Sequence, residues 1–112
     1  MPTYNKLIRD RIPEIIGNNG KTVTTRILDE KEYIEEVCKK IQEELAEYLE
    51  AGSKEHKVEE LADLLELVNA LAQYEGVTLE DVENARKQKA EKRGGFRERI
   101  FLVEVHDESF PS

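Results

Sequence analysis

The chain has 112 residues, 25 acidic and 17 basic, and its formal net charge of −8 excludes a duplex nucleic-acid binder that relies on an overall basic surface. This length fits one domain, residues 1–112, and no stretch approaches the roughly 20 apolar residues of a membrane helix. The single Cys38 excludes an internal disulfide and the N-terminus lacks an apolar signal-peptide core, so we expect a cytoplasmic protein.

The first half of the chain predicts a short helix, a strand and a long helix. Residues 9–18 form the short helix, which stops at Asn18-Asn19-Gly20. Residues 21–28 are rich in β-branched side chains and predict a strand. Asp29 then caps a long helix that runs to about Ala51.

The second half predicts two more helices and another strand. Gly52 suits the left-handed position after a helix, and Ser53 caps the next helix, which covers about residues 54–75. This short break makes the two long helices an antiparallel hairpin. A further helix ends at Gly94-Gly95, and residues 97–105 predict a strand that pairs with the first. We therefore expect a mainly α fold, a helical hairpin plus a further helix, with a small two-stranded sheet at its side.

The first long helix carries two glutamates at the edge of its apolar stripe. Glu44 lies one turn from both Ile41 and Tyr48 of this stripe, and Glu47 lies one turn further on. We expect the whole stripe to be buried, with its cysteine as a small core residue: Ile34, Val37, Cys38, Ile41, Leu45, Tyr48 and Leu49.

The second long helix is apolar on two sides, which is typical of a buried central helix. Glu60 and Asp63 extend one of these sides, where they are followed by Leu67, Ala70 and Tyr74. The other side carries Val58, Leu61, Ala62, Leu65, Val68 and Ala72.

The hairpin brings these acidic pairs together. Glu44 precedes the turn by about as many residues as Glu60 follows it, and Glu47 and Asp63 lie within about one turn of them. Four converging carboxylates repel one another unless a cation compensates, and their oxygen ligands suit Mg²⁺, with Mn²⁺ as a substitute. The alternative is a solvated acidic face, since either pair alone is common on exposed helices.

The acidic pairs and both ends of the chain resemble a known family. Residues 43–47 (Glu-Glu-Leu-Ala-Glu) and 60–63 (Glu-Leu-Ala-Asp) resemble the ExxE…ExxD signature of the MazG-like, all-α nucleoside triphosphate pyrophosphohydrolases. Residues 4–16 and 89–96, the latter followed by Arg-Ile-Phe-Leu, resemble a small phosphoribosyl-ATP pyrophosphohydrolase-like branch. The resemblance covers nearly the whole chain. The connection between the acidic pairs, residues 48–59, is short for the family and leaves little room for a base-recognising loop.

The resemblance implies a Mg²⁺-dependent enzyme that cleaves a nucleotide between the α- and β-phosphates, releasing a monophosphate and pyrophosphate. House-cleaning of surplus or non-standard nucleotides is the implied role. Glu44, Glu47, Glu60 and Asp63 take the family's metal-ligand positions. Glu47 is our candidate for the group that accepts the proton of the attacking water, and Glu66 is the second candidate.

Basic side chains near both ends of the chain are candidates for phosphate binding. Lys89, Lys92 and Arg93 continue the inward face of the last helix, and Lys6, Arg9 and Arg11 cluster near the N-terminus. Both groups have an alternative interpretation, which is pairing with the surplus acidic residues.

Two other functions and an assembly state complete the expectations. The chain could be a phosphoribosyl-ATP pyrophosphohydrolase of histidine biosynthesis, or an acidic helical interaction module without enzymatic activity. Because so small a domain buries a modest fraction of its surface, we expect a homo-oligomer, either a dimer or a tetramer.

Overall fold

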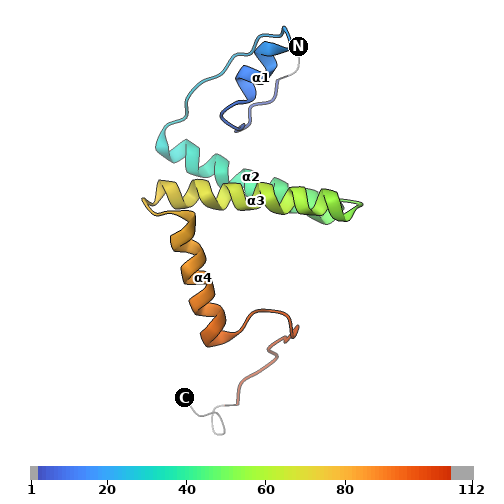
Figure 1. Cartoon of the computed structure of the whole chain (residues 1–112), viewed down its shortest axis with the longest axis vertical. Coiled ribbons are helices and arrows are strands. Elements are labelled where there is room, and N and C mark those ends of the chain that lie inside the picture. The colour runs from blue at the N-terminus through green and yellow to red at the C-terminus, as the bar shows by residue number, and fades with distance from the viewer. Residues whose placement is uncertain (1–2, 107–112) are drawn as a thin grey trace. The chain divides into compact units, whose positions relative to one another are not determined.

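The computed structural model describes residues 3–106, which contain α-helices and no strand (Figure 1). The helices are α1 (Ile12–Asn18), α2 (Glu30–Glu50), α3 (Lys54–Tyr74) and α4 (Leu79–Arg93). The chain divides after Leu79 into two compact units, the first of which contains α1, α2 and α3. No helix in this described part is long and apolar enough to cross a membrane.

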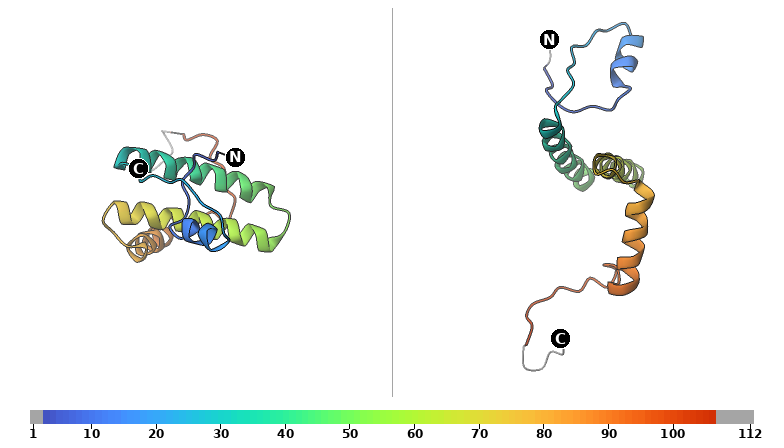
Figure 2. Two further views of the ribbon diagram at one scale, coloured as in Figure 1. Left: turned by 90° about the horizontal axis from the view of Figure 1, so that it is seen from above. Right: turned by 90° about the vertical axis from the view of Figure 1, so that its left-hand side faces the viewer.

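The α2–α3 hairpin is the packed part of the first unit, and both views of Figure 2 show its helices side by side. A side-chain cap begins each of these two long helices at the residue that the sequence predicts. The carboxylate of Asp29 accepts a hydrogen bond from the backbone N–H of Glu32 at 2.8 Å. The hydroxyl of Ser53 accepts one from the N–H of His56 at 3.2 Å. These caps satisfy backbone donors that the first turn of a helix leaves without partners.

The two long helices end differently. Gly76, with φ of 79°, follows α3, and the N–H of Val77 donates to the carbonyl of Ala72 at 2.9 Å. This pattern is a glycine-terminated helix end of the Schellman type. The left-handed conformation predicted for Gly52 is wrong, because α2 ends through an extended Ala51. Lys57 of α3 instead donates to the carbonyl of Tyr48 at 2.8 Å, which satisfies the end of α2 without a left-handed residue.

The predicted two-stranded sheet is wrong for the described residues. Neither residues 21–28 nor residues 97–105 form a strand. The β-branched side chains of these segments indicate a local preference, but a ribbon of two strands is marginally stable without a surface to cover it.

The core of the hairpin is narrow. Val37 of α2 and Leu67 and Ala72 of α3 are the buried hydrophobic side chains of the described residues. The burial predicted for Cys38 is wrong, because its side chain is exposed. Cys38 follows Val37 directly, and one residue turns a helix by about 100°, which carries it off the packed side.

The hairpin leaves an apolar face uncovered within the chain. We call this the outer face, and its members are at least one-third exposed: Leu45 and Leu49 of α2 and Val58, Leu61, Leu65 and Val68 of α3. The members on α3 recur at three- and four-residue steps and therefore form one stripe. The prediction that the whole α2 stripe and both apolar sides of α3 are buried is thus wrong within a single chain.

Removing the cap of α3 tests the local basis of the hairpin. Ser53→Ala is expected to lower the free energy of unfolding by about 1 kcal/mol, because the N–H of His56 loses its acceptor. Urea unfolding followed by circular dichroism measures the change. Thr24→Ala, at an exposed position outside the helices, is the control and should change it by less than about 0.5 kcal/mol. Equal changes in the two variants would contradict the assignment of Ser53 as a cap.

Candidate metal centre

The hairpin gathers three of the four predicted carboxylates. One oxygen from each of Glu44, Glu47 and Glu60 lies within 4.8 Å of the other two. Glu44 and Glu47 stand one turn apart on α2, and the tight connection sets the register that places Glu60 opposite them. We call these three side chains the carboxylate cluster.

Glu44 is the most unusual member of the carboxylate cluster. The residue is only 7% exposed, although it carries a carboxyl group. Within the described part of the chain, the buried Oε2 atoms of Glu44 and Glu60 have no hydrogen-bond partner. Buried carboxylate oxygens are unfavourable unless a hydrogen bond or an ion compensates them. The donor set therefore fits a hard divalent cation with oxygen ligands.

The electrostatics of the carboxylate cluster favour the same conclusion. Burial, and after it the nearby side chains of Glu60, Glu47 and Asp63, together raise the pKa of Glu44 from its ordinary value of 4.5 to about 8. Without a compensating cation, Glu44 therefore holds a proton through neutral pH. A bound divalent ion would favour the ionised form instead.

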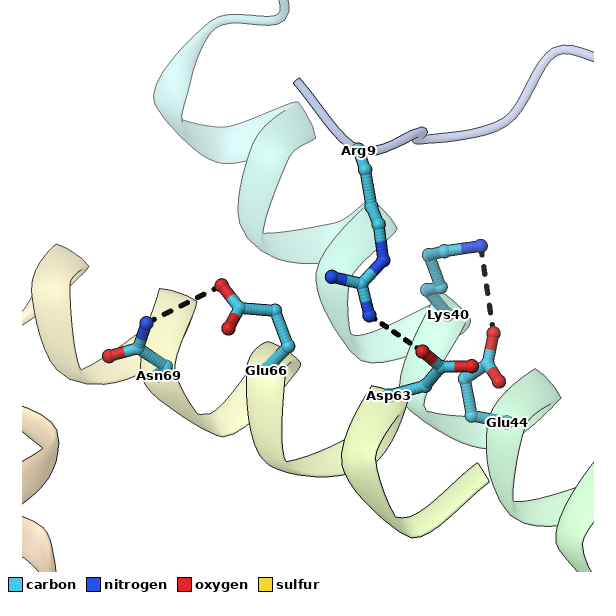
Figure 3. Close-up of polar contacts among 6 residues, drawn as sticks. All are labelled: Arg9, Lys40, Glu44, Asp63, Glu66 and Asn69. Carbon is cyan, nitrogen blue, oxygen red and sulfur yellow. Dashed lines mark hydrogen bonds and ion pairs between the residues drawn. The ribbon is translucent and has the colours of Figure 1, made fainter. Parts of the chain in front are cut away.

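Asp63, the fourth predicted ligand, lies outside the carboxylate cluster in this structure. Figure 3 shows Arg9, from the segment before α1, reaching toward it. The guanidinium of Arg9 donates to Oδ1 of Asp63 at 2.6 Å, and the two side chains are 56% and 37% exposed. The negative charge of Asp63 still contributes to the raised pKa of Glu44.

Lys40 is a residue of the centre that sequence reasoning missed. Its Nζ lies 3.8 Å from Oε1 of Glu44, and its side chain is only 21% exposed (Figure 3). The signal in the sequence was the spacing of four residues between Lys40 and Glu44, which places both on one side of α2. Such pairs are so common on solvated helices that the spacing alone did not single out Lys40.

A pocket of about 320 Å³ opens beside the centre. Basic, acidic and apolar side chains share its wall: Lys6, Ile8, Arg9, Ile12, Lys40, Glu44, Asp63, Glu66 and Leu67. Its volume is at the lower end of the range typical of small-molecule sites. The structure thus places two predicted phosphate-binding residues, Lys6 and Arg9, next to the predicted metal ligands.

The remaining predicted residues have other surroundings. Glu66 is exposed at the pocket and accepts a hydrogen bond from the amide of Asn69 at 3.4 Å. Arg11 forms an ion pair with Glu14 at 3.1 Å and does not line the pocket.

The predicted basic residues of α4 are exposed, and they belong to the second unit: Lys89, Lys92 and Arg93. Their role in phosphate binding stays a prediction.

Comparisons with known proteins found a matching family model and a curated relative. A family model described as phosphoribosyl-ATP pyrophosphohydrolase matches residues 1–90. An uncharacterized protein of Mycolicibacterium smegmatis is 39% identical over 54 residues, which are 48% of this chain and 55% of that protein. The matched part thus spans about half the length of this curated relative. No solved structure matches the chain.

The raised pKa of Glu44 predicts a pH-dependent stability in metal-free buffer. The folded chain holds the proton of the Glu44 carboxyl group more tightly than the unfolded chain does. The stabilising effect of this proton is therefore complete below about pH 4.5 and is lost as the pH rises toward about 8. Across that window Glu44→Gln should gain stability over the wild type, by up to about 1.4 kcal/mol per pH unit. Urea unfolding at several pH values in EDTA measures it. Glu43→Gln, exposed on the same helix, is the control, and parallel pH profiles for Glu44→Gln and the wild type would contradict the buried, crowded carboxyl.

Proposed function

Because the chain belongs to the phosphoribosyl-ATP pyrophosphohydrolase family, we propose that it is a Mg²⁺-dependent nucleotide pyrophosphohydrolase. The reaction is cleavage of a nucleoside triphosphate or related nucleotide between the α- and β-phosphates, which yields a monophosphate and pyrophosphate. The observation that carries the proposal is the buried Glu44, whose Oε2 has no hydrogen-bond partner among residues 3–106 and whose neighbours Glu47 and Glu60 are also carboxylates.

The proposed ligands of the ion are Glu44, Glu47, Glu60 and Asp63, the last after it separates from Arg9. Carboxylate oxygens favour Mg²⁺, and Mn²⁺ should substitute for it. When bound, the ion supplies neutralising charge for phosphate oxygens and a lowered pKa for water at the site.

The protein's own side chains have separate roles in this proposal. Glu47 is the exposed member of the carboxylate cluster and can accept a proton from water, and Glu66 at the pocket wall is the second candidate. Lys6 and Arg9 line the pocket and can bind phosphate oxygens. The basic residues outside the pocket are proposed for the same role: Arg11, Lys89, Lys92 and Arg93.

Phosphoribosyl-ATP is a second candidate substrate, which the description of the matching family favours. It contains the same phosphoanhydride bond as a nucleoside triphosphate, so the carboxylate cluster suits either substrate equally. The difference lies in the group attached to the adenine.

The deciding experiment incubates the protein with phosphoribosyl-ATP and a panel of nucleoside triphosphates in Mg²⁺, Mn²⁺ or EDTA, and identifies the products by ³¹P NMR. We expect pyrophosphate and a monophosphate in the presence of either metal and none in EDTA. Release of orthophosphate would contradict the bond assignment. Absence of any hydrolysis would favour the acidic interaction module.

Neutral substitutions within the carboxylate cluster test the assignment of ligands. Glu47→Gln and Glu60→Gln should each lower kcat/KM by about 100-fold or more, because an amide is a weaker ligand than a carboxylate. Glu59→Gln, at the exposed position next to Glu60, should stay within about 2-fold of the wild type. Steady-state pyrophosphate release measures all three, and similar losses in Glu59→Gln and Glu60→Gln would contradict the assignment.

We also propose that the chain forms a homo-oligomer through the outer face. This face leaves Leu49 of α2 and Val58 and Leu65 of α3 more than half exposed, and exposed apolar side chains gathered in this way are typical of an interaction surface. A second copy of the chain presents the same stripe, and a two-fold axis would bring the two stripes together. The functional side chains of the hairpin do not belong to this face.

Light scattering of size-separated protein tests this assembly. The wild type should have at least twice the mass of one chain, and Leu61→Lys should have a lower mass because it places a charge in the outer face. Glu59→Lys, an exposed position outside the apolar stripe, should leave the wild-type mass unchanged. A monomeric wild type, or an unchanged mass in Leu61→Lys, would contradict the proposal.

A further inference from the structure

Two basic residues of the first unit pair with proposed metal ligands. Arg9 contacts Asp63 at 2.6 Å, and Lys40 lies 3.8 Å from Glu44. Both basic side chains also line the pocket of about 320 Å³. Each of them therefore borders a carboxylate and an open space at the same time.

The contact between Arg9 and Asp63 is of a kind that is easily exchanged. Both side chains are substantially exposed, and ion pairs between exposed groups contribute little to stability. A divalent ion offers Asp63 twice the charge at a shorter distance than a guanidinium can reach. Arg9 comes from the segment before α1, so its release does not require the hairpin to change.

Lys40 is held near Glu44 without a hydrogen bond to it. The separation of 3.8 Å between Nζ and Oε1 is longer than a hydrogen bond, whereas the lysine side chain as a whole is largely covered. Packing on α2 therefore keeps the ammonium group beside the carboxylate cluster. An ammonium group in this position attracts any anion that enters the pocket.

We propose that Arg9 and Lys40 are exchangeable cations, which lie against Asp63 and Glu44 in the metal-free protein and contact the phosphates of a ligand once a divalent ion occupies the carboxylates. The ligand class is a polyphosphate chain, and Lys6 adds a third positive charge at the same pocket. This inference rests on the proposed metal-dependent function. It assigns Lys40 a binding role that its spacing in the sequence does not reveal.

Exchange of partners predicts two opposite effects of one substitution. Because a positive charge beside a carboxyl group opposes the binding of a metal ion there, its removal should tighten metal binding. Because the same charge attracts phosphate, its removal should weaken polyphosphate binding. A residue that only supports the fold would weaken both, and one that only binds phosphate would leave metal binding unchanged.

Isothermal titration calorimetry with the full chain separates these roles. The first titrant is magnesium chloride alone, and the second is inorganic pyrophosphate in saturating magnesium chloride. Lys40→Met keeps the length of the stem and removes its charge, and Arg9→Gln removes the charge that contacts Asp63. Lys39→Met, an exposed neighbour outside the pocket beside the centre, is the matched control.

For Lys40→Met and Arg9→Gln we expect the Kd of Mg²⁺ to fall about 3- to 10-fold and that of pyrophosphate to rise about 10-fold. Lys39→Met should change neither Kd by more than about 2-fold. Unchanged or weaker Mg²⁺ binding in both variants, with normal binding in the wild type, would overturn the exchange and leave the proposed function standing. Absence of Mg²⁺ binding in the wild type would overturn the proposed function as well.

Discussion

Electrostatic repulsion within the hairpin is the constraint on which the rest of this structure depends. Two helices joined by a short turn place carboxylate oxygens of Glu44, Glu47 and Glu60 within 4.8 Å of one another, and one of these residues is buried. The folded chain reduces this repulsion in several ways. The raised pKa of Glu44 keeps a proton on it, Lys40 lies beside it, and Arg9 pairs with Asp63. A divalent ion could replace all of these compensations, which is why the arrangement suits a metal centre.

The hairpin separates two kinds of surface. Its carboxylate cluster and the neighbouring pocket carry charged groups suited to a metal and phosphates. The outer face carries leucine and valine side chains and no group that such chemistry needs. Because residues 3–106 bury few hydrophobic side chains, the outer face stays uncovered, and the assembly proposed through it would not compete with the centre.

Features of the fold with local causes were predictable from the sequence. Asp29 and Ser53 cap helices through hydrogen bonds that span three residues, and Gly76 ends α3 through its own backbone conformation. The convergence of Glu44, Glu47 and Glu60 required only helical periodicity and a short turn.

Features that depend on distant partners were not predictable in this way. Arg9 and Asp63 are 54 positions apart, so their contact depends on the path of the whole N-terminal segment. The prediction of a left-handed conformation at Gly52 was wrong. The ammonium group of Lys57, on the next helix, donates to the carbonyl of Tyr48 at the end of α2 instead. The prediction of two strands was wrong because β-branched side chains indicate only a local preference, whereas a stable sheet also needs a surface to pack on.

Paramagnetic broadening by Mn²⁺ tests the central claim most directly, because it locates the ion without requiring a substrate. In ¹⁵N-labelled protein, substoichiometric Mn²⁺ should broaden the amide signals of residues 43–48 and 59–64 before those of the acidic residues on α4, such as Glu83 and Glu91. Equal broadening at all acidic positions, or broadening that begins on α4, would show that the hairpin does not form a metal centre.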